Sequence, residues 1–143
     1  MNRRTFALAL SALALGCLPP ARAAQAPALK NLGGTRWMMV LPKGSSCEVP
    51  PEVDFAKDGT LEGDTGCNEF GGTWETDGKR LSIKRRNKTS RNCAKQFLDL
   101  EHAFAGALDR TASAKPAGSD LILLDAEGRE LLRLTPAVAG SCQ

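Results

Sequence analysis

The chain has 143 residues, and its 19 basic and 16 acidic side chains give a formal net charge of +3. This is the length of one domain, long enough to bury a hydrophobic core. The basic excess comes from Arg3, Arg4 and Arg22, and the chain after residue 23 carries 16 basic and 16 acidic side chains. A neutral domain excludes nucleic-acid binding driven by overall charge.

The first 23 residues have the pattern of an export signal. Arg3 and Arg4 form a positive start, an apolar run follows over residues 6–18, and Ala-Arg-Ala at residues 21–23 is a small-x-small cleavage pattern. The run is too short for a stable transmembrane helix. We therefore expect a signal peptide over residues 1–23, no membrane span after its removal, and a bacterial protein that is periplasmic or secreted.

Two other export patterns overlap this signal. Residues 14–17 resemble a lipobox, which would make the protein a membrane-anchored lipoprotein through Cys17. Residues 2–6 resemble a twin-arginine signal, although the usual leucine and the basic residue after it are missing. We favour plain cleavage near Ala23, by either export route, and keep the lipoprotein as the alternative.

The next part of the chain predicts a leader followed by strands. Residues 24–33 are rich in Ala, Pro and Gly and indicate a flexible leader. Residues 35–41 predict a first strand with Trp37 as its large core residue. Asp-Gly and Glu-Gly pairs then indicate hairpin turns at residues 58–59, 77–78 and 127–128. The strands expected around them cover residues 53–55, 60–62, 73–76, 80–83, 121–124 and 130–134.

A glycine-rich stretch over residues 63–72 holds four glycines around Gly66-Cys67-Asn68. Glycine suits a backbone with positive φ or a close approach to another segment. The cysteine and the asparagine can each fix such a backbone, one covalently and one by hydrogen bonds. We interpret the stretch as a structural junction between sheet and helix.

One helix is predicted over residues 94–108, with Asn92 as its N-cap. Its apolar face has spacings of 3, 4 and 4 and consists of Phe97, Leu100, Phe104 and Leu108. The carboxylate of Glu101 lies about 40° from the centre of this face, so it needs donors. We expect those donors on a nearby turn, around Asn68 or around Thr89. His102 falls about 140° away, on the solvent side.

Runs of strands without alternating helices predict an α+β protein that is mostly β. We expect a curved antiparallel sheet, a half-barrel of about seven or eight short strands, packed on one α-helix.

Together these features resemble the META domain, also called the HslJ-like family. The resemblance covers residues 34–137 and leaves a tail over residues 138–143. It is carried by Trp37, by Gly63-x-x-Gly66-Cys67-Asn68-x-Phe70-x-Gly72, by Thr89-x-x-x-Cys93 before a helix with Glu101, and by Leu121-x-Leu123-x-Asp125-x-x-Gly128. It implies a curved sheet on one helix, an envelope setting, and links to heat-shock response, antibiotic tolerance and secretion. It offers no catalytic residues.

Four cysteines remain after the signal, and they allow three connectivities. We favour Cys67–Cys93, joining the glycine-rich turn to the helix entrance, and Cys47–Cys142, joining an early loop to the tail. A redox or metal site is disfavoured because there is no Cys-x-x-Cys and the only histidine lies on the outer helix face.

The sequence also lacks a catalytic constellation. His102 is the sole imidazole and lies nine residues from Cys93 on the same helix, so it cannot serve as base to that thiol. Asp64 and Glu69 are better explained as turn residues. We therefore expect no enzyme activity, no catalytic residues, no cofactor and no metal.

A basic segment over residues 79–95 holds eight basic side chains and no acid. Its candidate partner surface consists of Lys84, Arg85, Arg86, Lys88 and Arg91. An envelope protein or an anionic lipid headgroup would suit it, and the alternative is an ordinary solvated loop. Nucleic acid is disfavoured, because only Phe97 lies near enough to stack on a base.

We therefore expect a monomeric accessory or stress-tolerance factor of the cell envelope that acts by binding. One alternative is a secreted enzyme inhibitor that presents a rigid loop over residues 84–92. The other is a lipid-binding or pilot-like secretion accessory protein with an apolar groove beside the helix.

Overall fold

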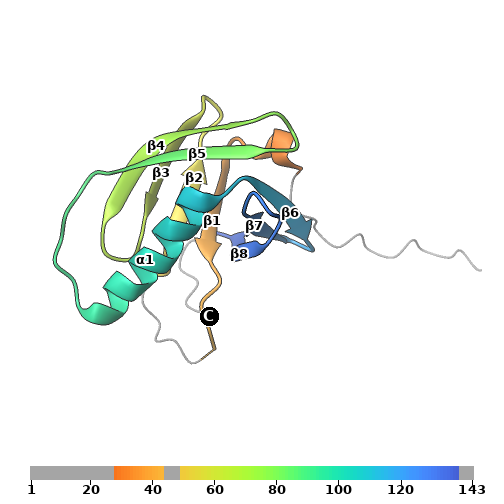
Figure 1. Cartoon of the computed structure of the whole chain (residues 1–143). Helices are drawn as coiled ribbons and strands as arrows, with labels where there is room; N and C mark the ends of the chain where they lie inside the picture. The colour runs from red at the N-terminus through yellow and green to blue at the C-terminus, as the bar shows by residue number, and fades with distance from the viewer. Residues whose placement is uncertain (1–27, 44–48, 139–143) are drawn as a thin grey trace, which may run out of the picture.

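The computed structural model describes residues 28–43 and 49–138 (Figure 1). Within these residues the chain forms eight strands, one α-helix and one short 3-10 helix. In chain order they are η1 (Leu29–Asn31), β1 (Thr35–Met39), β2 (Glu52–Phe55), β3 (Thr60–Asp64), β4 (Glu69–Thr76), β5 (Leu81–Asn87), α1 (Lys95–Arg110), β6 (Ser113–Ala117), β7 (Asp120–Leu124) and β8 (Glu130–Pro136). The predicted α+β, mostly β fold is confirmed.

The strands form one antiparallel sheet in the order β5-β4-β3-β2-β1-β8-β7-β6. The two halves meet where β1 pairs with β8, with Trp37 opposite Pro136. The sheet curls until its edge strands approach, and the Leu81 N–H donates to the Ala112 carbonyl at 2.9 Å across the opening. The curved half-barrel predicted from the turns is therefore confirmed.

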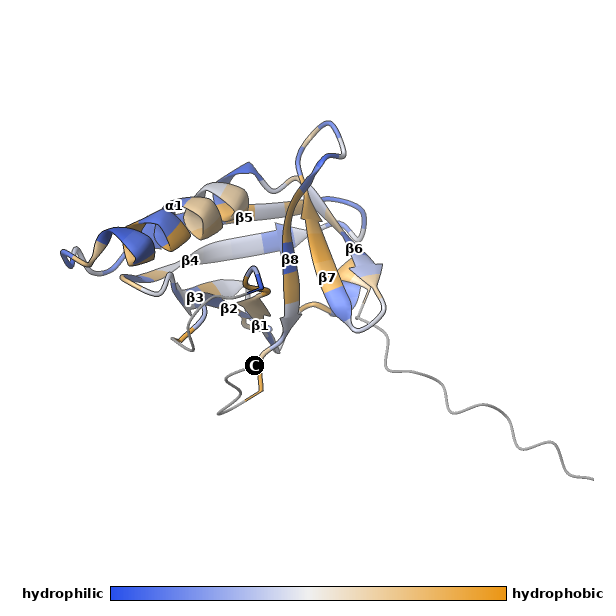
Figure 2. Ribbon diagram, turned by 90° about the horizontal axis from the view of Figure 1, so that it is seen from below, coloured by the Kyte–Doolittle hydropathy of each residue, from blue (hydrophilic) through white to orange (hydrophobic). Residues whose placement is uncertain are grey.

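Helix α1 connects the two edge strands and packs against β5, β7 and β8. Phe104 and Leu108 are fully buried, and the Phe104 ring lies 6.2 Å from the Phe70 ring between centroids. Phe97 and Leu100 are only half-buried, because the first half of α1 makes less contact with the sheet. Figure 2 shows that the half of α1 nearer β8 is the more hydrophobic one. The predicted apolar face is thus fully buried only in its second half.

The core lies on the concave face of the sheet. Its largest fully buried side chains are Trp37, Phe55, Phe70, Phe104, Leu32, Leu61, Leu81, Leu108, Leu121, Leu123, Leu134 and Val53. Leu29 and Leu32 belong to this core, with exposures of 7% and 0%. The expectation of a flexible leader over residues 24–33 is therefore wrong for its second half, which hydrophobic burial holds against the sheet.

The hairpin turns have the expected chemistry. Gly59 and Gly78 adopt φ values of 87° and 91°, which side chains with a Cβ rarely adopt. Strand β6 was not predicted, because it contains Pro116. A proline is tolerated there because β6 is the edge of the sheet and pairs on one side only.

The prediction of Asn92 as the helix N-cap is wrong. Helix α1 begins at Lys95, and Ala94 precedes it with extended backbone and no capping side chain. The preceding segment is instead held to the turn between β3 and β4, because Cys93 is bonded to Cys67 and the Arg91 N–H donates to Asn68.

Several predictions lie outside the described residues: the signal over residues 1–23, lipidation of Cys17, and the Cys47–Cys142 pair. No helix in the described part of the chain combines the length and the hydrophobicity needed to cross a membrane.

Candidate functional site

The turn between β3 and β4 is held by its own polar groups. Gly66 adopts φ of 89°, and its N–H donates to the Asp64 carboxylate at 2.6 Å. The Thr65 hydroxyl is fully buried, accepts from the Asn68 N–H at 2.9 Å and donates to the Asn68 carbonyl at 3.0 Å. The turn therefore has one fixed shape, which presents the Asn68 side chain to the rest of the chain.

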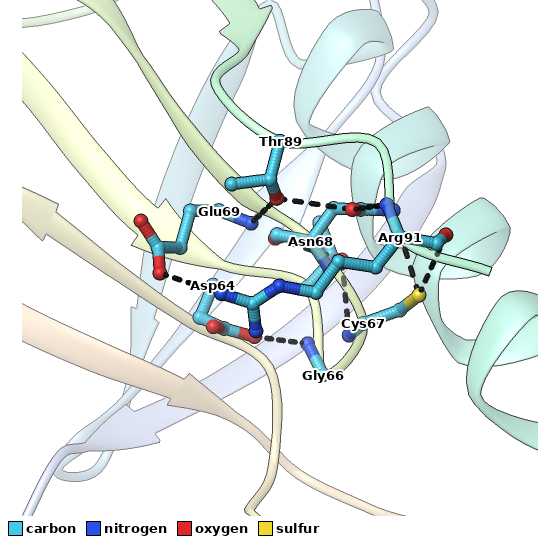
Figure 3. Close-up of polar contacts among 8 residues, drawn as sticks. Asp64, Gly66, Cys67, Asn68, Glu69, Thr89 and Arg91 are labelled. Carbon is cyan, nitrogen blue, oxygen red and sulfur yellow. Dashed lines mark hydrogen bonds and ion pairs between the residues drawn. The ribbon is translucent and has the colours of Figure 1, made fainter. Parts of the chain in front are cut away.

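The Asn68 side chain joins the turn between β3 and β4 to α1 and to the segment before α1, and Figure 3 shows its contacts with Thr89 and Arg91 of that segment. Its amide nitrogen donates to both carboxylate oxygens of Glu101, at 3.2 and 3.1 Å. Its amide oxygen accepts from the Arg91 N–H at 2.6 Å and from the Thr89 hydroxyl at 3.0 Å. The expectation that a turn satisfies Glu101 is confirmed for Asn68, while Thr89 acts through Asn68 rather than on Glu101.

A disulfide between Cys67 and Cys93 closes the same region, with their Cα atoms 6.0 Å apart. The predicted pairing of these two cysteines is confirmed. We call the set Gly66, Cys67, Asn68, Cys93 and Glu101 the junction. It fixes the sheet to the entrance of α1, with its two cysteine sulfurs bonded to each other and the Asn68 amide hydrogen-bonded through both its nitrogen and its oxygen. Among the described residues no group of three or more His, Cys, Asp and Glu side chains is arranged to hold a metal ion.

The basic segment is divided between the two faces of the sheet. Successive side chains of a strand point to opposite faces, so Arg85 points to the concave side and Arg86 to the outside. The Arg85 side chain is 13% exposed, and its guanidinium contacts the Asp109 carboxylate at 3.0 and 2.8 Å and lies 5.8 Å from the Phe70 ring centroid. Arg85 therefore fastens β5 to α1 and is not part of the outer surface.

Carboxylates from other strands neutralise much of the remaining segment. Lys88 pairs with Glu62 at 2.6 Å, and Arg91 pairs with Glu69 at 3.2 Å. The run of basic residues in the sequence is thus not an equally basic surface in space.

Lys84 and Arg86 remain on the outer face. Lys84 approaches Glu75 only to 4.0 Å, the outer limit for an ion pair. Arg86 is exposed and contacts no hydrogen-bond acceptor or carboxylate among the described residues. The Thr73 hydroxyl, directly across from Lys84 on β4, is exposed and has no hydrogen-bond partner in the same part of the chain.

These three side chains border a shallow hollow of about 530 Å³ on the outer face of β4 and β5, which we call the outer hollow. Its lining consists of Gly71, Gly72, Thr73, Lys84, Arg86, Asn87 and Lys88. A Cβ on Gly72 would collide with the Lys84 carbonyl, and one on Gly71 would lie 2.6 Å from the Lys88 Cε. Gly72 lets the backbones of β4 and β5 approach closely, and the buried Gly71 lies beneath the aliphatic stem of Lys88, so the floor of the hollow consists of Gly72 backbone and this stem.

Two further hollows lie nearby. One, of about 310 Å³, lies over β2, β3 and β4 and includes five carboxylates, those of Glu52, Asp54, Glu62, Asp64 and Glu69, together with Arg36 and Lys88. The other, of about 500 Å³, lies at the opening between β5 and β6. None of the three is lined by the apolar side chains of α1.

Residues 30–138 match the META domain. The chain belongs to the META domain family. No curated protein matches the sequence.

Solved structures share the META domain fold seen here. One protein solved by NMR is 21% identical, with a TM-score of 0.58, over 78% of this chain and 97% of its own. A protein from Burkholderia xenovorans, also solved by NMR, is 22% identical with a TM-score of 0.58, over 85% and 98%. A DUF4847 family protein from Bacteroides vulgatus ATCC 8482 is 15% identical with a TM-score of 0.53, over 74% and 94%. At these identities the likeness concerns the fold.

Three residues of this META domain were not identified from the sequence. Thr65 is the buried hydroxyl that shapes the junction turn, and its signal was weak because threonine is common in strands. Asp109 binds Arg85 across 24 residues, a separation that no local pattern reveals. Thr73 borders the outer hollow, and its position follows from strand alternation only after the register with Lys84 is known.

Proposed function

We propose that this META domain protein is an exported, non-enzymatic accessory protein of the bacterial cell envelope, and that it contributes to stress tolerance by binding an anionic partner. The observation that carries the proposal is Arg86. It is exposed, lacks an acceptor among the described residues and borders the outer hollow beside Lys84. An unpaired guanidinium at the edge of a surface hollow is suited to recognise an anion.

Binding suits the remaining chemistry better than turnover does. The junction uses its polar atoms for hydrogen bonds within the fold, and its two cysteines are joined. His102, the only histidine of the sequence, is exposed on α1. The export pattern over residues 1–23 supports the envelope setting, where Cys17 would serve as the anchor if the lipobox is used.

The two alternatives receive less support. The loop expected of an inhibitor over residues 84–92 is a strand up to Asn87, and the rest is held to the body by Asn68. A lipid-binding or pilot-like role requires an apolar groove beside α1, whereas the hollows described above lie elsewhere.

Photo-crosslinking in the native bacterium tests the proposal. A photoreactive amino acid at Thr73, in the outer hollow, should yield a crosslinked envelope component. The crosslink should be lost in Lys84→Glu/Arg86→Glu. Lys79→Glu is the matched control, because Lys79 is exposed at the tip of the same hairpin and its side chain has no partner among the described residues.

A crosslink that persists in the double variant would contradict the proposed binding face. Recovery of the protein in the cytoplasmic fraction, with its first 23 residues intact, would contradict export.

A further inference from the structure

We infer that the outer hollow is a binding site for a phosphate monoester. The inference rests on the proposed function and names the chemistry of its ligand. Three hydrogen-bond donors surround the hollow and are free or loosely held: the Arg86 guanidinium, the Lys84 ammonium and the Thr73 hydroxyl.

The positive charge and the hydrogen-bond donors at the outer hollow are complementary to a phosphate monoester. A phosphate monoester carries about −1.5 to −2 charges at neutral pH and three strong acceptor oxygens. Lys84 and Arg86 supply two positive charges, and they lie about 7 Å apart along β5 because they are two residues apart in one strand. The planar guanidinium can hold two phosphate oxygens, and the ammonium and hydroxyl can donate to the third.

The surroundings select a compact anion over an extended one. On the outer face of β4 the hollow lies between Glu69 and Glu75, and Glu62 lies beside it on β3. An acidic peptide laid along β4 would meet these carboxylates at both ends and be repelled. A single phosphate group contacts only the central donors.

The floor of the hollow suits the group that carries the phosphate. Gly72 offers half-buried backbone without a side chain, and the aliphatic stem of Lys88 covers the buried Gly71 on its way to Glu62. A flat, partly apolar group such as a sugar ring can pack on this floor while its phosphate faces Arg86 and Lys84. A phosphorylated lipid headgroup and a soluble sugar phosphate share this chemistry.

Amide NMR titration of the mature full chain tests the inference with two probes. Glucose 1-phosphate represents the soluble ester, and phosphatidylcholine vesicles containing phosphatidic acid represent the headgroup. With either probe, shifts should concentrate at residues 71–73 and 84–88. Saturation by the sugar phosphate assigns a soluble ligand, and binding to the acidic vesicles with a much weaker sugar phosphate response assigns a headgroup.

Three variants distinguish binding at the outer hollow from general attraction of an anion to a positively charged surface. Arg86→Gln should weaken binding about tenfold, because it removes a charge-assisted, two-pronged contact. Thr73→Val should weaken binding about threefold. Lys79→Gln, outside the hollow, should leave affinity unchanged.

Three results would overturn the inference: no shifts with either probe, equal losses in Arg86→Gln and Lys79→Gln, or stronger binding of a hexaglutamate peptide than of glucose 1-phosphate. If these occur while the Thr73 crosslink still depends on Arg86, the inference fails and the proposed function stands. If phosphate binds but no envelope crosslink depends on Arg86, the proposed function fails and the site remains.

Discussion

The junction and the outer hollow are both rich in polar groups, yet they differ in how those groups are used. At the junction, the side-chain amide of Asn68 contacts Glu101, Arg91 and Thr89, and the region is closed by a disulfide. At the outer hollow, the side chains of Arg86 and Thr73 have no partner among the described residues. Satisfied buried groups stabilise and specify a fold, whereas exposed donors without partners cost little and stay available for a ligand. The junction therefore stabilises the fold, and the outer hollow is the region for which we propose binding.

The largest expected effect is at the junction, with Asn68→Ala. This change removes the amide group that donates hydrogen bonds to Glu101, a residue that is only 8% exposed. The Glu101 carboxylate then stays buried without these hydrogen bonds. We expect the free energy of unfolding to fall by about 3–4 kcal/mol, measured by urea denaturation. The double variant Asn68→Ala/Glu101→Leu should recover part of this loss, because it removes the buried charge as well.

Asn92→Ala is the matched control for Asn68→Ala. Asn92 is exposed and does not cap α1, so its removal should change the free energy of unfolding by less than about 0.5 kcal/mol. A loss of about 1 kcal/mol or more at Asn92 would instead indicate a helix cap.

The second effect concerns the disulfide of the junction. Cys67 and Cys93 close a loop across 26 residues, so Cys67→Ser/Cys93→Ser should lower the free energy of unfolding by about 3 kcal/mol in the chain-entropy account. Phosphate binding at the outer hollow should be unchanged under native conditions. Non-reducing peptide mapping of the parent should link Cys67 to Cys93 and, as predicted from the sequence, Cys47 to Cys142. A Cys47–Cys67 peptide would contradict both pairings.

The third prediction compares the effects of replacing two adjacent arginines, Arg85 and Arg86, on stability. Arg85→Gln should lower the free energy of unfolding by about 1–2 kcal/mol, because it breaks the two-pronged contact with Asp109 and the contact with the Phe70 ring. Arg86→Gln should lie within about 0.5 kcal/mol of the parent. Equal losses in the two variants, measured by thermal and urea unfolding, would show that the two side chains are not divided between structure and surface.

Arg85 and Arg86 also show which features of the structure can be predicted from the sequence and which cannot. The Asp-Gly pairs, the helical spacing and the position of Cys93 predicted the hairpins, the burial of Glu101 and one disulfide, since each depends on local geometry. The predicted fifth strand ended at residue 83, whereas β5 continues to Asn87. It continues because β4 begins at Glu69 and offers a partner along its whole length. Gly71 and Gly72 concealed that extension, because glycine is a poor strand former.

Because the sequence does not reveal that β5 continues beyond residue 83, it also does not reveal that Arg85 and Arg86 lie on opposite faces of the sheet. The five basic residues from Lys84 to Arg91 therefore formed one candidate surface in the sequence. Their division depends on Asp109, Glu62 and Glu69, which reach them from other elements. Such pairings across a sheet follow from register, and register is set by the packing of the whole core.

The smallest effect tests how the β4–β5 hairpin, which carries the outer hollow, is kept in register. Hydrogen bonds from the backbone N–H groups of Arg80 and Lys79 hold the pKa of the Asp77 carboxyl at about 2, below its usual value of 3.8. Because the folded-state pKa is depressed, the stabilisation is fully present above about pH 4 and is lost as the pH falls towards 2. The stability difference between the parent and Asp77→Asn should therefore be largest at pH 5 and shrink towards pH 2, measured by thermal unfolding. Asp77 is exposed at the hairpin tip, so a carboxyl titration midpoint near 3.8 in NMR would mean that solvent competes successfully for these bonds. The hairpin would then depend on its strand pairing and on the hydrogen bonds of the Thr76 hydroxyl with Arg80 and Gly78.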